Sequence, residues 1–150
     1  MSPDRWAHFL FAVMCAGIYA AILYARHGKA STGRIASIAL AFPFLFLGSA
    51  VPDLDISLFG IGGHRNILFH SALPYFAFAW LCNRTSYRSE ILTAVKVAFA
   101  LGLGSHLIMD FPQGRIVGMP TSFLDPLWLL GNGIAVVLVS VREHGRGVCV

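Results

Sequence analysis

The stretch SEILTAVKVAFALGLGSHLIMD, residues 89–110, decides the fold class of this chain, because it is apolar along most of its length and polar at one end. A helix rises about 1.5 Å per residue, so about 20 apolar residues cross the ~30 Å hydrocarbon core of a bilayer. Residues 89–109 have that length. The stretch therefore predicts a transmembrane helix with His106 and Asp110 at one membrane surface.

The rest of the chain extends this prediction to an all-α, polytopic membrane helix bundle. The chain is 57% hydrophobic and 12% charged, and a soluble globule of this size could not hide so much apolar surface. With residues 89–109, four further apolar runs predict about five transmembrane helices in a single domain, residues 1–150. Pro74 is expected to bend the third run or loosen its first turns. The four runs are 7–25, 35–52, 67–82 and 123–141.

Basic residues predict the orientation of this bundle. Five helices place the N-terminus and the 52–66 and 110–122 loops on one side, and the other loops and the C-terminal tail on the opposite side. The side with the N-terminus carries three cations, Arg5, Arg65 and Arg115. The opposite side carries seven: Arg26, Lys29, Arg34, Arg84, Arg88, Arg142 and Arg146. The positive-inside rule then predicts the N-terminus outside and the C-terminus inside, in a bacterial inner membrane. The net charge of +4 is explained by this asymmetry, and no nucleic-acid partner is expected.

Histidine and aspartate residues gather on the predicted outer side. His106 and Asp110 are four residues apart and share one helix face, while Asp53 and Asp55 follow Pro52 at the end of a predicted helix. Taken singly, each pair has a simpler explanation as a hydrogen bond at a helix end or a turn.

His64 and His70, on either side of the third helix's predicted start, could be interfacial histidines beside an anchoring Arg65, and His8 a polar residue satisfied by a neighbour. Together, however, these side chains lie at one membrane depth, which indicates a metal site. Imidazole and carboxylate ligands without thiolates suit Zn²⁺, with Mn²⁺ or Fe as alternatives, and more than four of them suit two ions. The candidate ligands are His8, Asp53, Asp55, His64, His70, His106 and Asp110.

These motifs also resemble a known family. Pro52-Asp53-Leu54-Asp55, His64-Arg65 with His70-Ser71, and Gly102 to Asp110, with a histidine near the N-terminus, resemble the YdjM-like predicted membrane-bound metal-dependent hydrolases. That family is distantly similar to zinc-dependent phospholipase C and the fungal zinc nucleases, which are helical and collect their ligands in the order His, Asp, His, HxxxD. That order falls on His8, Asp53, His64 or His70, and His106 with Asp110. Ile56 stands where the family often has a further histidine, and the spacing from His64 to His70 is one residue longer than usual.

The resemblance implies metal-assisted hydrolysis of a phosphoester. Its metal would be held by Asp53, His70, His106 and Asp110. The remaining residues, His8, Asp55 and His64, would bind a second ion, or orient the ligands and supply a general base.

Arg65 would pair with a phosphate, so the expected catalytic residues are Asp55, His64 and Arg65. A site at the membrane surface favours a phospholipid or lipid-linked phosphate as substrate, with membrane lipids as partners and no expectation for the oligomeric state. Two alternatives stay open: a metal-binding transporter component, since intramembrane histidine and aspartate can line an ion path, and an accessory membrane protein with a structural metal.

Overall fold

The computed structural model describes the chain except residues 1–2, 28–31, 86–89, 113–115, 118–123 and 148–150. Its described part is helical and contains no strand, only an isolated bridge between Asn66 and Val117. The all-α prediction is therefore confirmed. The elements are α1 (Pro3–His27), α2 (Thr32–Ala50), α3 (Leu54–Phe59), the 3-10 helix η1 (Ile61–Gly63), α4 (Leu73–Arg84), α5 (Glu90–Asp110) and α6 (Leu124–Gly147).

Among the described residues, three helices are long and apolar enough to cross a membrane: Trp6–Ala25 within α1, the whole of α5, and Leu124–Glu143 within α6. In α2 the apolar part, Ala36–Ala50, is shorter, and α4 has only 12 residues. Three of the predicted spans are thus supported by length and composition. Five spans and an outward N-terminus remain predictions.

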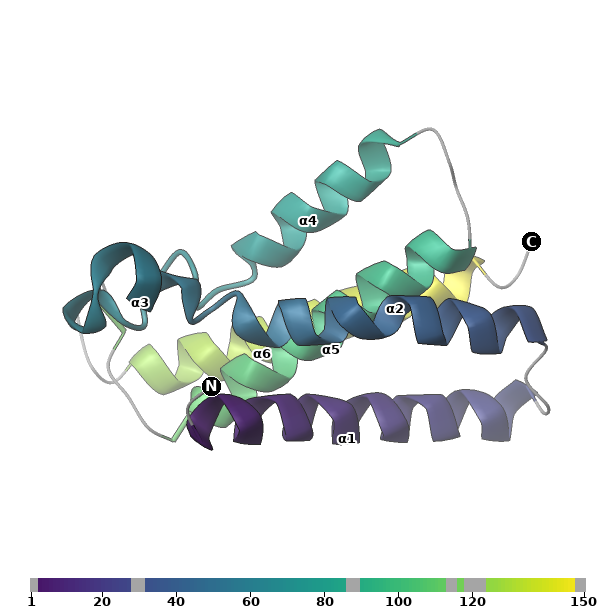
Figure 1. Ribbon diagram of the computed structural model, residues 1–150, viewed down its shortest axis with the longest axis horizontal. Helices are drawn as coiled ribbons and strands as arrows, with labels where there is room; N and C mark the ends of the chain where they lie inside the picture. Colours follow the sequence, from purple (N-terminus) through teal and green to yellow (C-terminus); the bar gives the residue numbers. More distant parts are fainter. Residues whose placement is uncertain (1–2, 28–31, 86–89, 113–115, 118–123, 148–150) are drawn as a thin grey trace.

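The third apolar run folds differently from the prediction. Its helix begins at Leu73 rather than at residue 67, and Pro74 occupies its first turn instead of bending it. Proline suits that position because the first turn of a helix leaves its N–H groups without intrahelical acceptors. The residues between α2 and α4 instead form α3, η1 and a loop, so the chain makes a compact connection at the end of α2 (Figure 1).

Helix α5 is the centre of the bundle and packs against both α2 and α6. Glycines permit both close crossings. A Cβ at Gly102 would lie 2.8 Å from Ser49 N and closer still to Leu45 O, both on α2. On the other side, a Cβ at Gly104 would lie 2.8 Å from Gly133 O of α6. These crossings bring the end of α2 directly against the last two turns of α5, where His106 and Asp110 lie.

Candidate metal centre

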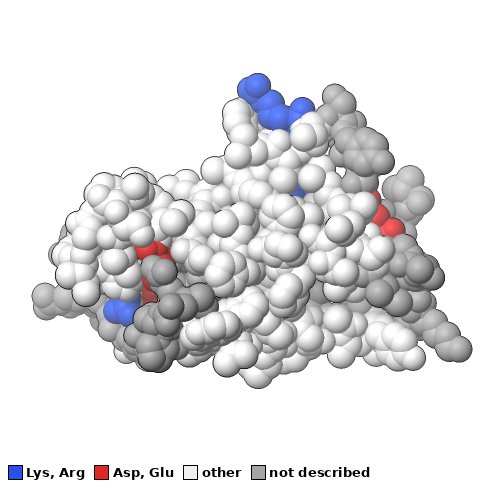
Figure 2. All heavy atoms as spheres, viewed as in Figure 1, with Lys and Arg blue, Asp and Glu red and all other residues white. Residues whose placement is uncertain are grey.

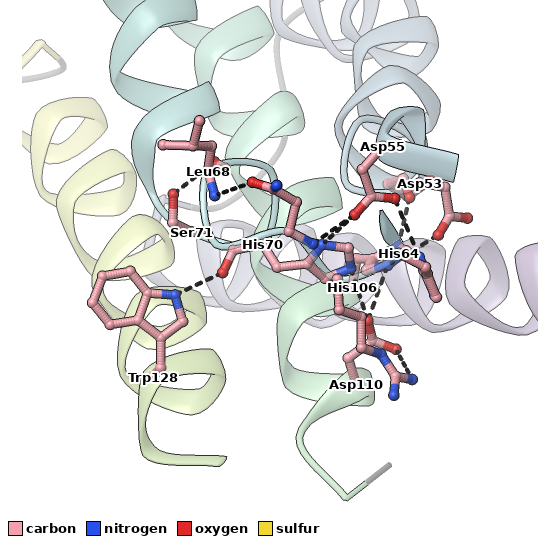
Figure 3. Close-up of polar contacts among 12 residues, drawn as sticks. Asp53, Asp55, His64, Leu68, His70, Ser71, His106, Asp110 and Trp128 are labelled. Atoms are coloured by element: carbon pink, nitrogen blue, oxygen red, sulfur yellow. Dashed lines mark hydrogen bonds and ion pairs between the residues drawn. The ribbon is translucent and has the colours of Figure 1, made fainter. Parts of the chain in front are cut away.

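The seven predicted ligands come together at one end of the bundle, and Figure 3 labels all of them except His8. They come from four parts of the chain: the first turns of α1, the α2–α3 connection with the start of α3, the loop before α4, and the last turns of α5. Three groups of them have ligand atoms within 4.8 Å of one another. The groups are His8 with His106 and Asp110, Asp53 with His70 and His106, and Asp55 with His64 and His70.

Asp110 lies in the middle of this arrangement. Its Oδ2 atom is 3.2 Å from His70 Nε2 and 3.4 Å from His106 Nε2. Its other oxygen, Oδ1, is 3.7 Å from His8 Nε2 and 3.4 Å from an Arg65 guanidinium nitrogen. The helical spacing of four residues aligns Asp110 with His106, while the tertiary fold brings the other three groups to it.

Several of the histidine nitrogens and carboxylate oxygens around Asp110 lie close together without meeting the geometry of a hydrogen bond. Both ring nitrogens of His70, His106 Nε2 and Asp110 Oδ2 are buried and have no hydrogen-bond partner within the described part of the chain. Zinc binds nitrogen and oxygen at about 2.0–2.1 Å, so tetrahedral ligands lie about 3.3–3.4 Å from one another. The observed separations of 3.2 and 3.4 Å match that value. These atoms therefore have the spacing of ligands that surround one ion.

In both buried histidines, His70 and His106, the second ring nitrogen, Nδ1, faces an acceptor. His106 Nδ1 lies 2.7 Å from the main-chain oxygen of Ser49, and His70 Nδ1 lies 3.2 Å from Asp55 Oδ2. Metal-binding histidines usually have such an acceptor at the second nitrogen, which fixes the ring and its tautomer. The two imidazoles are thus oriented with Nε2 toward Asp110.

Asp55 organises the side of the site that faces the 64–70 loop. Its side chain is fully buried, and Oδ2 also accepts a hydrogen bond from the Asn66 main-chain N–H at 2.9 Å. Oδ1 lies 3.2 Å from His64 Nδ1, and the His64 side chain is 27% exposed. One carboxylate therefore contacts both histidines of the loop, of which His70 is buried and His64 reaches the surface.

The carboxylates of the site are suited to a cation. Three aspartates, Asp53, Asp55 and Asp110, have side chains no more than 12% exposed, and Arg65 contacts Asp110. Buried charge is unfavourable unless it is compensated. A divalent cation would compensate it, so the donor set fits such an ion.

Arg65 is held in an unusual conformation. Its φ of 63° lies in the left-handed region, which is uncommon for residues other than glycine. The main-chain oxygen of Arg65 accepts a hydrogen bond from Val117 N at 2.9 Å, and Ile67 N donates to Val117 O at 3.2 Å. The loop is therefore fixed to the segment that follows α5, and this conformation directs the guanidinium to Asp110.

Helix α6 holds the loop that precedes α4 through two side-chain hydrogen bonds. Trp128 Nε1 donates a hydrogen bond to the main-chain oxygen of His70 at 2.9 Å (Figure 3). The Asn132 side chain accepts one from Ala72 N at 2.9 Å. Sequence patterns did not predict these contributions, nor that of Ser49. A main-chain acceptor such as Ser49 O has no signal in a sequence, but Asn132 within an apolar helix is a recognisable one.

Comparison with known proteins is consistent with this architecture. The family model described as YdjM inner membrane protein matches residues 4–136. That range includes all seven candidate ligands, all of α1 except its first residue, and the helices from α2 to α5. No curated protein and no solved structure matches the chain. Since the match covers most of the sequence, the chain belongs to the family of YdjM inner membrane proteins.

Proposed function

We propose that the chain is a membrane-embedded, metal-dependent hydrolase that acts on a phosphoester of a phospholipid or lipid-linked phosphate. The observation that carries this proposal is the arrangement around Asp110. Two buried histidines direct Nε2 to one carboxylate oxygen, at 3.2 and 3.4 Å, while their Nδ1 atoms face separate acceptors. Binding of a shared cation would account for that orientation, because metal-binding histidines usually have an acceptor at the second ring nitrogen.

The same geometry favours one principal ion over two. A ring nitrogen has one lone pair, and His106 Nε2 takes part in both groups that contain His106. Those groups therefore describe a single site, formed by His8, Asp53, His70, His106 and Asp110. His70 Nδ1 faces Asp55, so Asp55 and His64 surround this site rather than hold a second ion. The preferred ion is Zn²⁺, with Mn²⁺ or Fe as alternatives.

A metal bound here would acidify a coordinated water and polarise a phosphoryl oxygen. The protein's own contribution to hydrolysis comes from three residues at the exposed side. His64, partly exposed and backed by Asp55, is placed to accept a proton and pass it to solvent. Arg65, with its side chain 16% exposed, can donate hydrogen bonds to a phosphate while Asp110 fixes its position.

A structural metal is the second candidate function, and the burial of the ligands favours it. The side chains of His70, His106 and Asp110 are no more than 4% exposed, which is typical of a closed site. A transporter has less support. Along α5, all residues between Lys96 and Ser105 are apolar, and Ser105 Oγ donates its hydrogen bond to Gly102 O of the same helix.

Turnover distinguishes these candidates. Zinc-loaded protein in detergent is mixed with phosphatidylglycerol or with a polyprenyl phosphate, and release of phosphate or headgroup is measured with and without a chelator. The proposal predicts chelator-sensitive turnover that falls strongly in Arg65→Lys, because lysine cannot form a bidentate contact with phosphate. Arg84→Lys is the matched control, since Arg84 is exposed and stacks over Trp80 instead. Stable metal binding without turnover of either substrate class would favour the structural role.

A further inference from the structure

The connection formed by α3 and η1, residues 54–63, has an outer surface that is too apolar for contact with water alone. Leu54, Leu58, Phe59 and Ile61 are all exposed, and the exposed fraction of Ile61 reaches 86%. Large apolar side chains exposed side by side mark a surface that meets another apolar phase. The connection therefore needs a partner on its outer face.

Charge is absent from that face. The ten residues LDISLFGIGG contain one ionisable side chain, Asp55, and it is fully buried toward the histidines. Helix α3 is thus two-sided: Asp55 points into the candidate metal centre, and the leucines at 54 and 58 point out. At this end of the molecule, Figure 2 shows acidic and basic atoms in a hollow beside a broad uncharged surface.

The position of the connection identifies the apolar phase. Only Val51, Pro52 and Asp53 separate the end of α2 from the start of α3. Figure 1 places α3 at the end of the bundle where α2 and α5 end and where α1 and α6 begin, so it lies where the candidate spans reach a membrane surface. A short apolar segment at that depth can lie in the boundary between headgroups and acyl chains.

We propose that the α3–η1 connection lies in this boundary of the bilayer, with Leu58 and Ile61 among the acyl chains. The candidate metal centre would then sit at headgroup depth, because Asp55 is on the inner face of the same helix. This proposal concerns lipid contact and does not depend on hydrolysis. It holds or fails whether or not the protein turns over a substrate.

Spin labels at single cysteines test the proposal in the whole protein. Cys15, Cys82 and Cys149 are first replaced by alanine, and the protein is reconstituted into phosphatidylethanolamine–phosphatidylglycerol vesicles. Leu58→Cys and Ile61→Cys are labelled, and collisions with oxygen, which concentrates in lipid, are compared with collisions with a water-soluble nickel chelate. Ile18→Cys on the exposed face of α1, within a candidate span, is the lipid control, and Thr85→Cys after α4 is the water control.

The proposal predicts an oxygen-to-nickel ratio at both positions nearer to that of Ile18→Cys than to that of Thr85→Cys. A ratio equal to the water control would overturn it. Low collision rates with both reagents would also overturn it, because a protein surface would then cover the segment. In that case, spin–spin broadening that disappears on dilution with unlabelled chain would identify a second copy as the partner, and its absence would indicate cover by the same chain.

Discussion

A single methyl group at position 102 should disturb the candidate metal centre without touching any ligand. In Gly102→Ala the new Cβ would lie 2.8 Å from Ser49 N, compared with about 3.5–4.0 Å for an ordinary contact between heavy atoms. Helix α2 would have to move away by about 0.7 Å or more. The 2.7 Å contact between His106 Nδ1 and Ser49 O would then lengthen beyond the usual hydrogen-bond range of about 2.7–3.2 Å.

Two measurable losses follow from that movement. Overpacking of a close crossing destabilises a protein by about 1–3 kcal/mol, which a detergent-denaturation titration would detect. Loss of the acceptor at His106 Nδ1 should weaken metal binding about 10–100-fold, as removal of such outer contacts does elsewhere. Competition against a zinc chelator measures this affinity.

The matched control is Gly131→Ala in α6, where an added Cβ would have no atom within 4 Å. It should bind metal like the original protein and gain up to about 1 kcal/mol in stability, because alanine favours helix more than glycine does. The reasoning is refuted if Gly102→Ala matches the original protein in both stability and metal affinity.

Three further substitutions each test one contact: the support of His70 by Asp55, the hydrogen bond from Trp128, and the ion pair of Lys96 with Glu143. Asp55→Asn should reduce metal affinity about 10–100-fold without abolishing binding, because it weakens the support of His70 rather than removing a ligand; chelator competition would contradict this if affinity is unchanged. Trp128→Phe removes the hydrogen bond to His70 O and should lower stability by about 1 kcal/mol, measured by detergent denaturation, whereas an unchanged midpoint would exclude a supporting role. Lys96→Met breaks the ion pair with Glu143 at the opposite end, whose carboxylate is 41% exposed; it should cost no more than about 1 kcal/mol and leave the metal content intact, so metal loss would show coupling between the two ends.

Sequence patterns were sufficient for the parts of the fold that follow local rules. Apolar runs of membrane length predicted α1, α5 and α6, and the spacing of His106 and Asp110 predicted that they share a helix face. The gathering of histidine and aspartate at one end was predicted from topology alone, and the structure brings all seven residues together there. The metal itself stays a prediction.

The short elements could not be predicted in the same way. Helix α3 has six residues and derives its place from Asp55 on one side and exposed leucines on the other, which no local rule determines. The start of α4 was misplaced because residues 67–69 and 72 are apolar, yet the main chain of this segment is held in a loop by Val117 and Asn132. Hydropathy cannot distinguish an apolar loop fixed by distant partners from an apolar helix.

Metal content tests the central claim most directly. The protein is purified in detergent, loaded with zinc or manganese, freed of excess ion and analysed by plasma mass spectrometry beside Asp110→Asn and Asp125→Asn. Asp125 is a suitable control because it is buried but belongs to none of the three ligand groups.

The account predicts about one ion per chain in the original protein and in Asp125→Asn, and little in Asp110→Asn, which loses the carboxylate that both buried histidines face. A metal-free original protein after loading, or an Asp110→Asn variant that retains the full content, would contradict it.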